Sequence, residues 1–403
     1  MEEKKRVIVI GGYMVALIIL GILWPGSANF IEDFSDILFA RGILITDFFE
    51  TGSIPAALIN SGLVGIIGIA LVCFSRTTMS GPTIAAVFTL AGFALFGKTP
   101  INVWPVILGV AISAFILKEH FKNLLLVAMF GTALGPVVSL VAFGLGWGYW
   151  AGVSIGVVTG LILPALATHL LHTHQGFSLY NVGFTCGFVG MYVTGYLQMQ
   201  GYVPEMPLIW HEGSQLALGV VFTVYFASMV VFGWPGRKRA VKLWKLPGTL
   251  VTDFVTEQGF RPTIFNMGLV GLMGMLYIYV VGGVYNGPSL GGVFTMVGFA
   301  AFGKHVRNVW PIMVGVYIGS LISVWEAVEP GPLLAALFGT TLAPIAGRFG
   351  WLIGIFAGIV HLSVVMLVGP FHAGMNLYNN GFAGGLVGTL FIGISRWFYG
   401  FKR

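Results

Sequence analysis

The sequence predicts an all-α integral membrane protein built from two inverted repeats. Of its 403 residues, 57% are hydrophobic and only 8% are charged, and the mean hydropathy is +0.92. Soluble domains carry about 25% charged residues, so this chain has too little charge to cover a surface that faces water. Apolar stretches of about 17–25 residues, the length that crosses a bilayer as a helix, recur along the whole chain.

A duplicated block predicts the two repeats. Residues 81–98 recur as residues 287–304, and each copy continues into Asn-Val-Trp-Pro, so that Gly81 and Gly287 are 206 residues apart. Self-similarity of this length indicates that one structural unit occurs twice. We therefore expect a first transmembrane repeat over residues 1–201, an external connector over residues 202–214, and a second, inverted transmembrane repeat over residues 215–403.

The expected membrane segments of the first repeat are joined by short loops, except for a linker at residues 27–53 after the first span. An amphipathic stretch at residues 31–39 is typical of a helix that lies in the membrane interface, and the second repeat restarts at residues 215–234. The expected spans of the first repeat cover residues 7–24, 54–74, 81–97, 101–117, 124–143, 148–171 and 177–199.

The distribution of basic residues predicts the orientation, because cytoplasmic loops are enriched in Lys and Arg. With seven segments in each half, about 14 in all, the halves are upside-down relative to each other and both termini are cytoplasmic, in the plasma membrane. Lys304 falls on the cytoplasmic side, and Lys98 does not fit. If residues 81–97 and 287–303 are re-entrant, each half has five crossings and the inversion remains.

The first candidate site is a pair of helix starts, Gly81-Pro82-Thr83 and Gly287-Pro288-Ser289. Proline suits the first turn of a helix, and the free N–H groups of that turn attract anionic or polar groups. Inverted symmetry would make the two starts face each other across a substrate near the middle of the membrane. The alternative is that both are ordinary helix starts at the surface.

A second repeated motif joins a histidine to a Tyr-Asn pair, at His174 with Tyr180-Asn181 and at His372 with Tyr378-Asn379. Irregular backbone at membrane depth is tolerated only against protein or a water-filled cavity. The Tyr-Asn pairs are therefore candidates for substrate binding, and the histidines for gating or proton linkage. An interfacial tyrosine belt and interfacial histidines are the alternative.

Two further polar residues each recur 206 residues later, the spacing of Gly81 and Gly287. Asn60 and Asn266 lie in apolar spans, where a buried amide needs hydrogen-bond partners, and either bind solute or bridge broken backbone. Asp47 and Asp253 precede the second span of each half and are candidate gates, although a helix N-cap is the favoured interpretation.

These features favour transport. The halves lack a carboxylate in mid-span, the usual ion relay of pumps, and the sequence shows no phosphate-binding loop, nucleophile–base pair or metal-ligand spacing. We expect a transporter or channel-like permease for a small polar or anionic solute, with no enzymatic activity, no cofactor, no metal and no nucleic-acid partner. Its partners are the lipid bilayer, the solute and possible further copies of the chain. A lipid-handling or structural membrane protein is the alternative.

The duplicated Gly-Pro-Ser/Thr…Gly-Lys…Asn-Val-Trp-Pro block resembles an uncharacterised bacterial membrane family, domain of unknown function 1576, over nearly the whole chain. Two other families are similar in architecture only. Residues 377–388 look like a loose version of a urea-transporter motif, and the segments that begin at Gly81 and Gly287 match the short third and tenth helices of seven-plus-seven nucleobase and anion transporters. Fold alone does not imply function.

Overall fold

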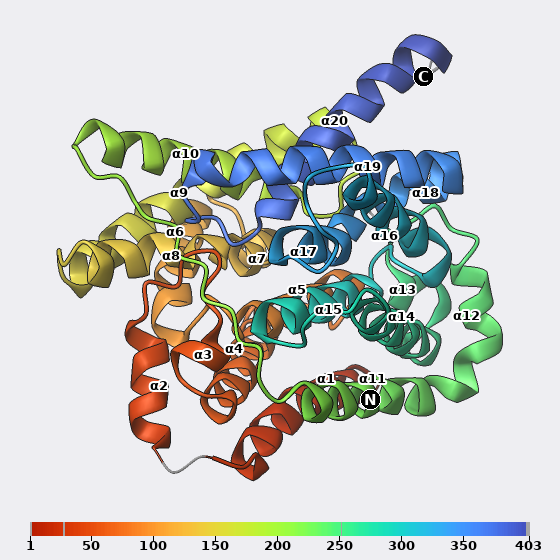
Figure 1. The fold of residues 1–403 in the computed structure, drawn as a ribbon, viewed down its shortest axis with the longest axis horizontal. Helices are drawn as coiled ribbons and strands as arrows, with labels where there is room; N and C mark the ends of the chain where they lie inside the picture. The colour runs from red at the N-terminus through yellow and green to blue at the C-terminus, as the bar shows by residue number, and fades with distance from the viewer. Residues whose placement is uncertain (1, 27–28, 251, 400–403) are drawn as a thin grey trace.

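The protein is all-helical, as Figure 1 shows for the computed structural model. The structure describes residues 2–26, 29–250 and 252–399, so the extreme ends of the two expected repeats, residue 1 and residues 400–403, lie outside the described residues. Within these ranges no β-strand occurs, apart from an isolated parallel bridge between Thr46 and Ile209. The predicted fold class is therefore confirmed as all-α.

The described residues of the first half form ten α-helices. The sequence places the second span and the interfacial helix within a residue or two of the observed bounds. These helices are α1 (Glu2–Leu23), α2 (Phe30–Phe39), α3 (Phe48–Thr51), α4 (Ile54–Phe74), α5 (Gly81–Phe93), α6 (Pro100–Ile116), α7 (Phe121–Gly131), α8 (Gly135–Ser139), α9 (Tyr149–His174) and α10 (Asn181–Met199).

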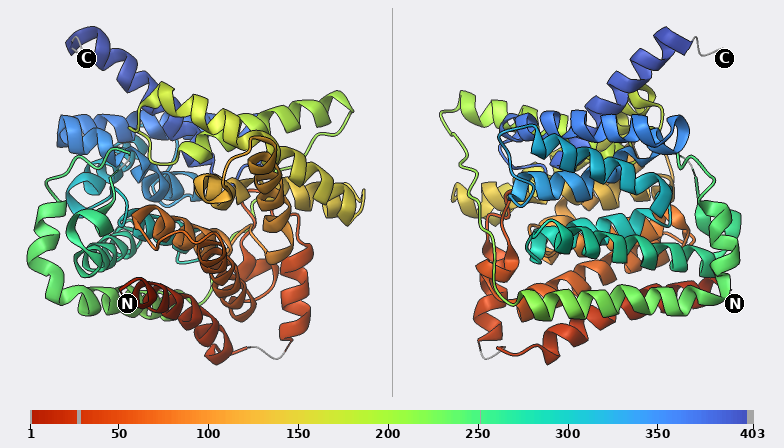
Figure 2. Two further views of the ribbon diagram at one scale, coloured as in Figure 1. Left: turned by 180° about the vertical axis from the view of Figure 1, so that it is seen from behind. Right: turned by 45° about the vertical axis from the view of Figure 1, so that its right-hand side comes forward.

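The second half repeats this order. Residues 200–214 form a long connection without helix along one side of the molecule (Figure 2). The helices that follow are α11 (Gln215–Gly233), α12 (Arg237–Leu243), α13 (Phe254–Gln258), α14 (Phe260–Val280), α15 (Gly287–Phe299), α16 (Val306–Leu321), α17 (Pro330–Phe338), α18 (Ala343–Phe349), α19 (Trp351–Val368) and α20 (Asn379–Tyr399).

Eight helical segments among the described residues are long and apolar enough to cross a membrane. This number is smaller than the 14 segments expected from the sequence, and it indicates a polytopic membrane protein. The eight are Glu2–Leu23, Ile54–Phe74, Phe121–Gly144, Tyr149–His174, Gln215–Leu243, Phe260–Val280, Pro330–Phe349 and Trp351–His372.

The two short helices α5 and α15 form the centre of the fold. Each has 13 residues, which makes a helix of about 20 Å, shorter than the roughly 30 Å hydrocarbon core. They run antiparallel, since Gly81 at the start of α5 lies against Ala301 beyond the end of α15, and Gly287 lies against Leu95. Around them, α5 packs on α4 and α7, and α15 on α14 and α17.

Close approach of α5 and α15 depends on glycine. A Cβ at Gly92 would lie 2.8 Å from the carbonyl oxygen of Gly291, and one at Gly291 would lie 2.6 Å from that of Gly92. Because no side chain fits at either position, the two backbones touch where the helices cross. The chain segments that follow the two helices, residues 94–99 and 300–305, are buried.

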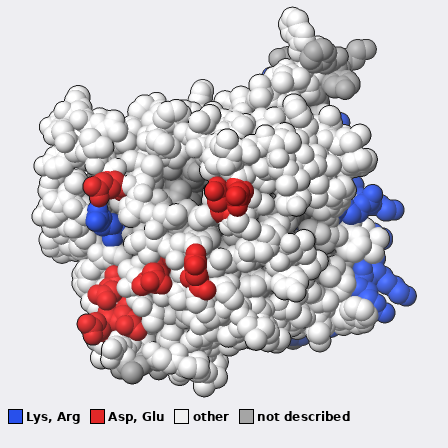
Figure 3. Space-filling model, in the orientation of Figure 1, with Lys and Arg blue, Asp and Glu red and all other residues white. Residues whose placement is uncertain are grey.

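Charged side chains are concentrated at two ends of the molecule. In Figure 3, Lys and Arg gather at the right-hand edge, where α12 lies in Figure 1, and Asp and Glu lie to the left and at the front. The sequences of the helices agree, because α12 carries Arg237, Lys238 and Arg239 and α2 carries Glu32, Asp33 and Asp36. The surface between the ends exposes many large apolar side chains.

Candidate functional site

The helix starts at Gly81 and Gly287 are satisfied by protein groups. Thr83 Oγ1 accepts the backbone N–H of Ser80 at 2.8 Å, and Ser289 Oγ accepts that of Asn286 at 2.9 Å. These bonds form the N-terminal capping boxes that the Gly-Pro-Thr/Ser sequences encode. Pro82 and Pro288 occupy the first turn, where a missing N–H costs nothing.

Each helix start also binds a carboxylate of the opposite half. Asp253 Oδ1 accepts the N–H of Gly81 at 2.9 Å, and Asp47 Oδ1 accepts the N–H of Gly287 at 3.2 Å. A carboxylate at a helix N-terminus neutralises the positive end of the helix dipole. The sequence predicts that a solute binds at these two helix starts. In the structure, the side chains of Asp253 and Asp47 occupy those positions instead.

The expectation that the two helix starts face each other is wrong. Because α5 and α15 are antiparallel neighbours, Gly81 and Gly287 lie at opposite ends of the pair, each beside the C-terminal end of the other helix. None of Gly81, Pro82, Thr83, Gly287, Pro288 and Ser289 lines the central cavity described below.

Asp47 and Asp253 both serve as helix N-caps, as the favoured interpretation of the sequence expects. Asp47 is fully buried and also accepts the backbone N–H groups of Phe49 at 3.0 Å and His211 at 3.1 Å. Burial raises the pKa of Asp47 to about 7, whereas these N–H donors and His211 act to lower it. Asp253 is only half-buried and accepts from Val255 and Thr256.

The repeated asparagines bridge irregular backbone after the short helices. Asn60 Nδ2 donates to the carbonyls of Ala94 and Lys98, at 2.6 and 2.8 Å. Asn266 Nδ2 donates to those of Ala300 and Lys304, both at 2.8 Å. Carbonyls at a helix end lack partners within the helix, so these amides fix the turns that carry the two lysines.

The repeated histidines and asparagines bind each other. His174 Nε2 lies 2.9 Å from Asn181 Oδ1, and His372 Nε2 lies 2.9 Å from Asn379 Oδ1. The amide of Asn181 also donates to the Ala167 carbonyl at 3.0 Å. Each pair ties the start of α10 or α20 to the helix before it, a positioning role that the sequence did not anticipate.

Tyr180 and Tyr378 bind two fully buried lysines, and each pair joins one half of the chain to the other. Lys98 Nζ donates to Tyr378 Oη at 2.6 Å, and Lys304 Nζ donates to Tyr180 Oη and, at 2.7 Å, to Thr340 Oγ1. The lysine nitrogens lie 4.6 and 4.5 Å from the ring centres of Tyr378 and Tyr180. The prediction that Lys304 lies in a cytoplasmic loop is therefore wrong. Lys98 does not fit the predicted orientation because it, too, is buried inside the protein.

Breaks in two membrane helices hold the tyrosines in place. The chain is 3₁₀-helical between α7 and α8 and again between α17 and α18, at the repeated Gly-Thr sequences. The N–H of Leu377 donates to the Ala133 carbonyl at 3.1 Å, and that of Leu179 donates to the Thr341 carbonyl at 3.0 Å. Each break thus binds the segment that carries the tyrosine of the opposite half.

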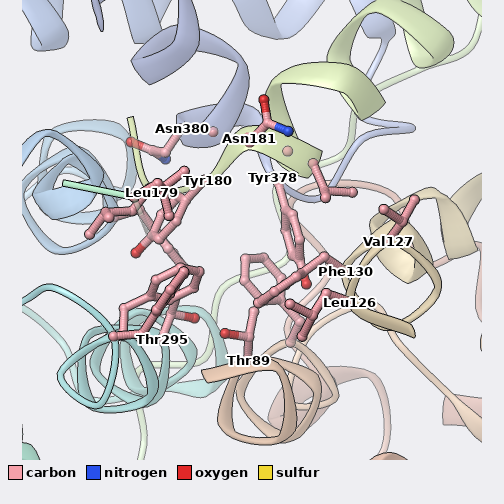
Figure 4. A pocket seen from close by; sticks show the side chains of 18 of the residues that line it. Thr89, Leu126, Val127, Phe130, Leu179, Tyr180, Asn181, Thr295, Tyr378 and Asn380 are labelled. Carbon is pink, nitrogen blue, oxygen red and sulfur yellow. The ribbon is translucent and has the colours of Figure 1, made fainter. Parts of the chain in front are cut away.

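A cavity of about 260 Å³ lies between the two tyrosines (Figure 4). Corresponding residues of the two halves line it in pairs. Thr89 and Thr295 project from the two short helices at its base, and the rings of Tyr180 and Tyr378 stand above them. The pairs that line it are Thr89 and Thr295, Phe93 and Phe299, Phe130 and Phe338, Leu179 and Leu377, Tyr180 and Tyr378, Val182 and Asn380, and Gly183 and Gly381.

The cavity is not symmetric, because α7 contributes residues that α17 does not. Asn123, Leu126 and Val127 line the cavity from α7; Asn123 is exposed, and the other two are half-buried. At the corresponding positions of α17, Leu334 is 5% exposed and Ala335 is fully buried. The α7 side of the cavity is therefore more exposed than the α17 side.

Three of the predicted site residues line the cavity, and the others do not. Tyr180, Asn181 and Tyr378 line it, whereas Asn379 does not and its neighbour Asn380 does. The sequence analysis missed Lys98, Lys304 and Thr340. The sequence did contain a signal for the two lysines, because both occupy the same position in the duplicated block. Neither has a repeated acidic residue beside it.

Eight of the described helical segments are long and apolar enough to cross a membrane, and polar residues of both halves meet at the centre. These features define a polytopic helical membrane protein. The chain belongs to a family described as a protein of unknown function (DUF1576), whose model matches residues 27–199 and 237–397. No match was found among curated proteins or solved structures. Among the described residues no three His, Cys, Asp or Glu side chains gather as a metal site would require.

Proposed function

We propose that this protein is an integral membrane transporter or channel-like permease that carries a small polar or anionic solute through the central cavity. The observation that carries the proposal is the paired lining of the cavity by corresponding residues of both halves. Secondary transporters place their substrate at such a repeat interface near the middle of the bilayer. The proposal involves no chemical conversion of the solute.

The proposal includes two inverted repeats of seven segments each. The antiparallel contact of α5 with α15 supports it, as does the exchange of equivalent bonds between the halves, with Lys98 on Tyr378 and Lys304 on Tyr180. Helices too short to span, such as α5 and α15, are typical of transporter repeats whose discontinuous helices end near the substrate.

Unequal exposure of α7 and α17 supports alternating access. In an inverted-repeat transporter, the two halves exchange conformations when access passes from one side of the membrane to the other. Here Asn123 of α7 is exposed and Leu126 and Val127 are half-buried, whereas α17 buries Leu334 and Ala335 at the positions of the latter two. In this proposal, the structure represents the conformation in which the cavity opens beside α7.

Basic residues support a plasma-membrane orientation with cytoplasmic termini. Lys5 and Arg6 near the N-terminus share a groove with Arg239 and Arg261, so the start of α1 and the region around α12 lie at the same end. An end rich in Lys and Arg faces the cytoplasm under the positive-inside rule.

This same groove is the one observation that favours the lipid-handling alternative. Apolar Ile8, Val9 and Phe232 line it beside the basic side chains, a combination that suits an anionic lipid headgroup and its first methylenes. The groove shares no lining residue with the central cavity. We therefore assign it to lipid contact at the membrane surface and keep the cavity as the solute path.

Uptake into proteoliposomes tests the proposal. Liposomes with the full chain are compared with empty liposomes for urea, formamide, glycerol, acetate and benzoate. The expected result is faster passage of at least one solute, reduced about tenfold by Val127→Trp, because the indole fills the cavity beside α7. The matched control is Val224→Trp on the exposed face of α11, which is 64% exposed and leaves passage unchanged. Passage equal to that of empty liposomes for every solute, or insensitive to Val127→Trp, would overturn the proposal.

A further inference from the structure

The two buried lysines have no carboxylate to neutralise them. Both side chains are fully buried, and no Asp or Glu forms an ion pair with either in the described part of the chain. Buried charges in proteins are ordinarily paired or bound to ions, since an isolated ion in a medium of low dielectric constant is costly. The only polar groups that accept hydrogen bonds from these ammonium groups in the described residues are the hydroxyls of Tyr378, Tyr180 and Thr340.

The tyrosine hydroxyls retain a free donor. A phenol oxygen that accepts from an ammonium group still carries its own hydrogen. Neither Tyr180 nor Tyr378 donates that hydrogen to any acceptor among the described residues, and both tyrosines line the cavity. An O–H polarised by a neighbouring cation forms stronger bonds to an anion than to a neutral acceptor.

The remaining lining sets the shape of the ligand. No Asp, Glu, Lys or Arg is among the lining residues, and five phenylalanines line the cavity together with leucines and valines: Phe93, Phe130, Phe299, Phe302 and Phe338. Such a wall gives a fully hydrated inorganic ion few donors to replace its water. It favours an apolar body instead, at about 25 cal/mol for each Å² of apolar surface removed from water.

From these three observations we infer that the solute is a small organic anion with an apolar body. Its charged group accepts hydrogen bonds from the hydroxyls of Tyr180 and Tyr378, and Lys304 and Lys98 supply the compensating positive charge behind them. The apolar body packs against the phenylalanine rings. This inference rests on the proposed function, because it names the class of solute for the same cavity.

Calorimetric titration of the purified full chain with four probes tests the inference. Benzoate, benzamide and benzylamine share one ring and differ in charge, and acetate keeps the charge without the ring. We expect benzoate to bind about tenfold more tightly than benzamide or acetate, because each lacks one of the two recognised features. Benzylamine, a cation, is expected to bind most weakly.

Two variants test which groups contribute to benzoate binding. Lys98→Met removes one ammonium group, and the double variant Tyr180→Phe, Tyr378→Phe keeps both rings and removes only the hydroxyls. Each is expected to weaken benzoate about tenfold while changing benzamide much less. The control, Lys238→Met, removes an exposed lysine of α12 and leaves all four affinities unchanged.

The outcomes separate this inference from the proposed function. Equal affinity for benzoate and benzamide, equal affinity for acetate and benzoate, or no loss of benzoate binding in the tyrosine double variant would each overturn the inference. If that happens while neutral solutes still cross in a manner sensitive to Val127→Trp, the transport proposal stands alone. If benzoate binds as expected but no solute crosses, the anion site stands and transport falls.

Discussion

The two halves of the molecule agree at their buried polar centres and differ at the helices that wall the cavity. Lys98 with Tyr378 and Lys304 with Tyr180 repeat one arrangement, and Asn60 and Asn266 fix the same two carbonyls in each half. In contrast, α7 leaves Leu126 half-buried where α17 buries Leu334. Under the proposed function, the groups that bind solute would belong to a symmetric core, and the asymmetric outer helices would set access to them.

The largest expected difference between the halves concerns the two aspartates. Asp47→Ala should lower the free energy of unfolding by about 3 kcal/mol, because the buried N–H groups of Phe49 and Gly287 lose their acceptor. Asp253→Ala should cost about 1 kcal/mol, since water reaches this half-buried position and replaces the carboxylate. Thermal unfolding of both variants in detergent measures the difference. Equal losses would show that the two caps are equivalent despite their burial.

Asp47 also predicts a pH dependence. Its pKa of about 7 in the folded protein lies above the 3.8 of a free aspartate carboxyl, so the folded state holds the proton more tightly. The stabilisation is complete below the lower value and is lost as the pH rises through about 7. Unfolding midpoints should therefore fall across that window in the native chain and stay level in Asp47→Asn. A slope that survives this substitution would assign the titration to another group.

A smaller difference is expected at the repeated asparagines. Asn266 Oδ1 accepts the indole N–H of Trp244 at 3.1 Å, whereas Asn60 Oδ1 has no partner among the described residues. Both alanine variants release two carbonyls, at a cost of about 2 kcal/mol, and Asn266→Ala should cost about 1 kcal/mol more because the indole N–H also loses its acceptor. The double-mutant cycle with Trp244→Phe isolates that extra bond. A coupling near zero would show that water replaces it.

Much of the fold was accessible from the sequence because membrane helices and duplications leave direct traces. Apolar runs located α4 and α9, and a constant spacing paired Asp47 with Asp253 and Asn60 with Asn266. The site was less accessible, because it depends on how the halves cross. Gly81 and Gly287 are correct helix starts, but only the antiparallel packing shows that each is capped by the other half.

The lysines illustrate the same limit. A Lys in a short segment between two apolar runs is ordinarily a loop residue that marks the cytoplasmic side, and this assumption placed Lys304 outside the core. Its partner Tyr180 is 124 residues away, and the partner of Lys98 is 280 residues away. No local pattern connects residues so distant. The available signal was that Lys98, which does not fit the predicted orientation, occupies the same position in the repeated block as Lys304.

The smallest effect that we predict tests the asymmetry itself, through Leu126 and Leu334, which occupy the same position in α7 and α17. Each is replaced by cysteine in a chain whose Cys73 and Cys186 are first changed to alanine, and a membrane-impermeant thiol reagent is added. Leu126→Cys should react about tenfold faster, because thiol reactions require access of the reagent. If the halves exchange conformations, a transported solute should raise the rate at Leu334→Cys and lower it at Leu126→Cys. Equal rates without solute would mean that the described asymmetry is absent in the membrane, and rates that never respond to solute would favour a fixed channel over alternating access.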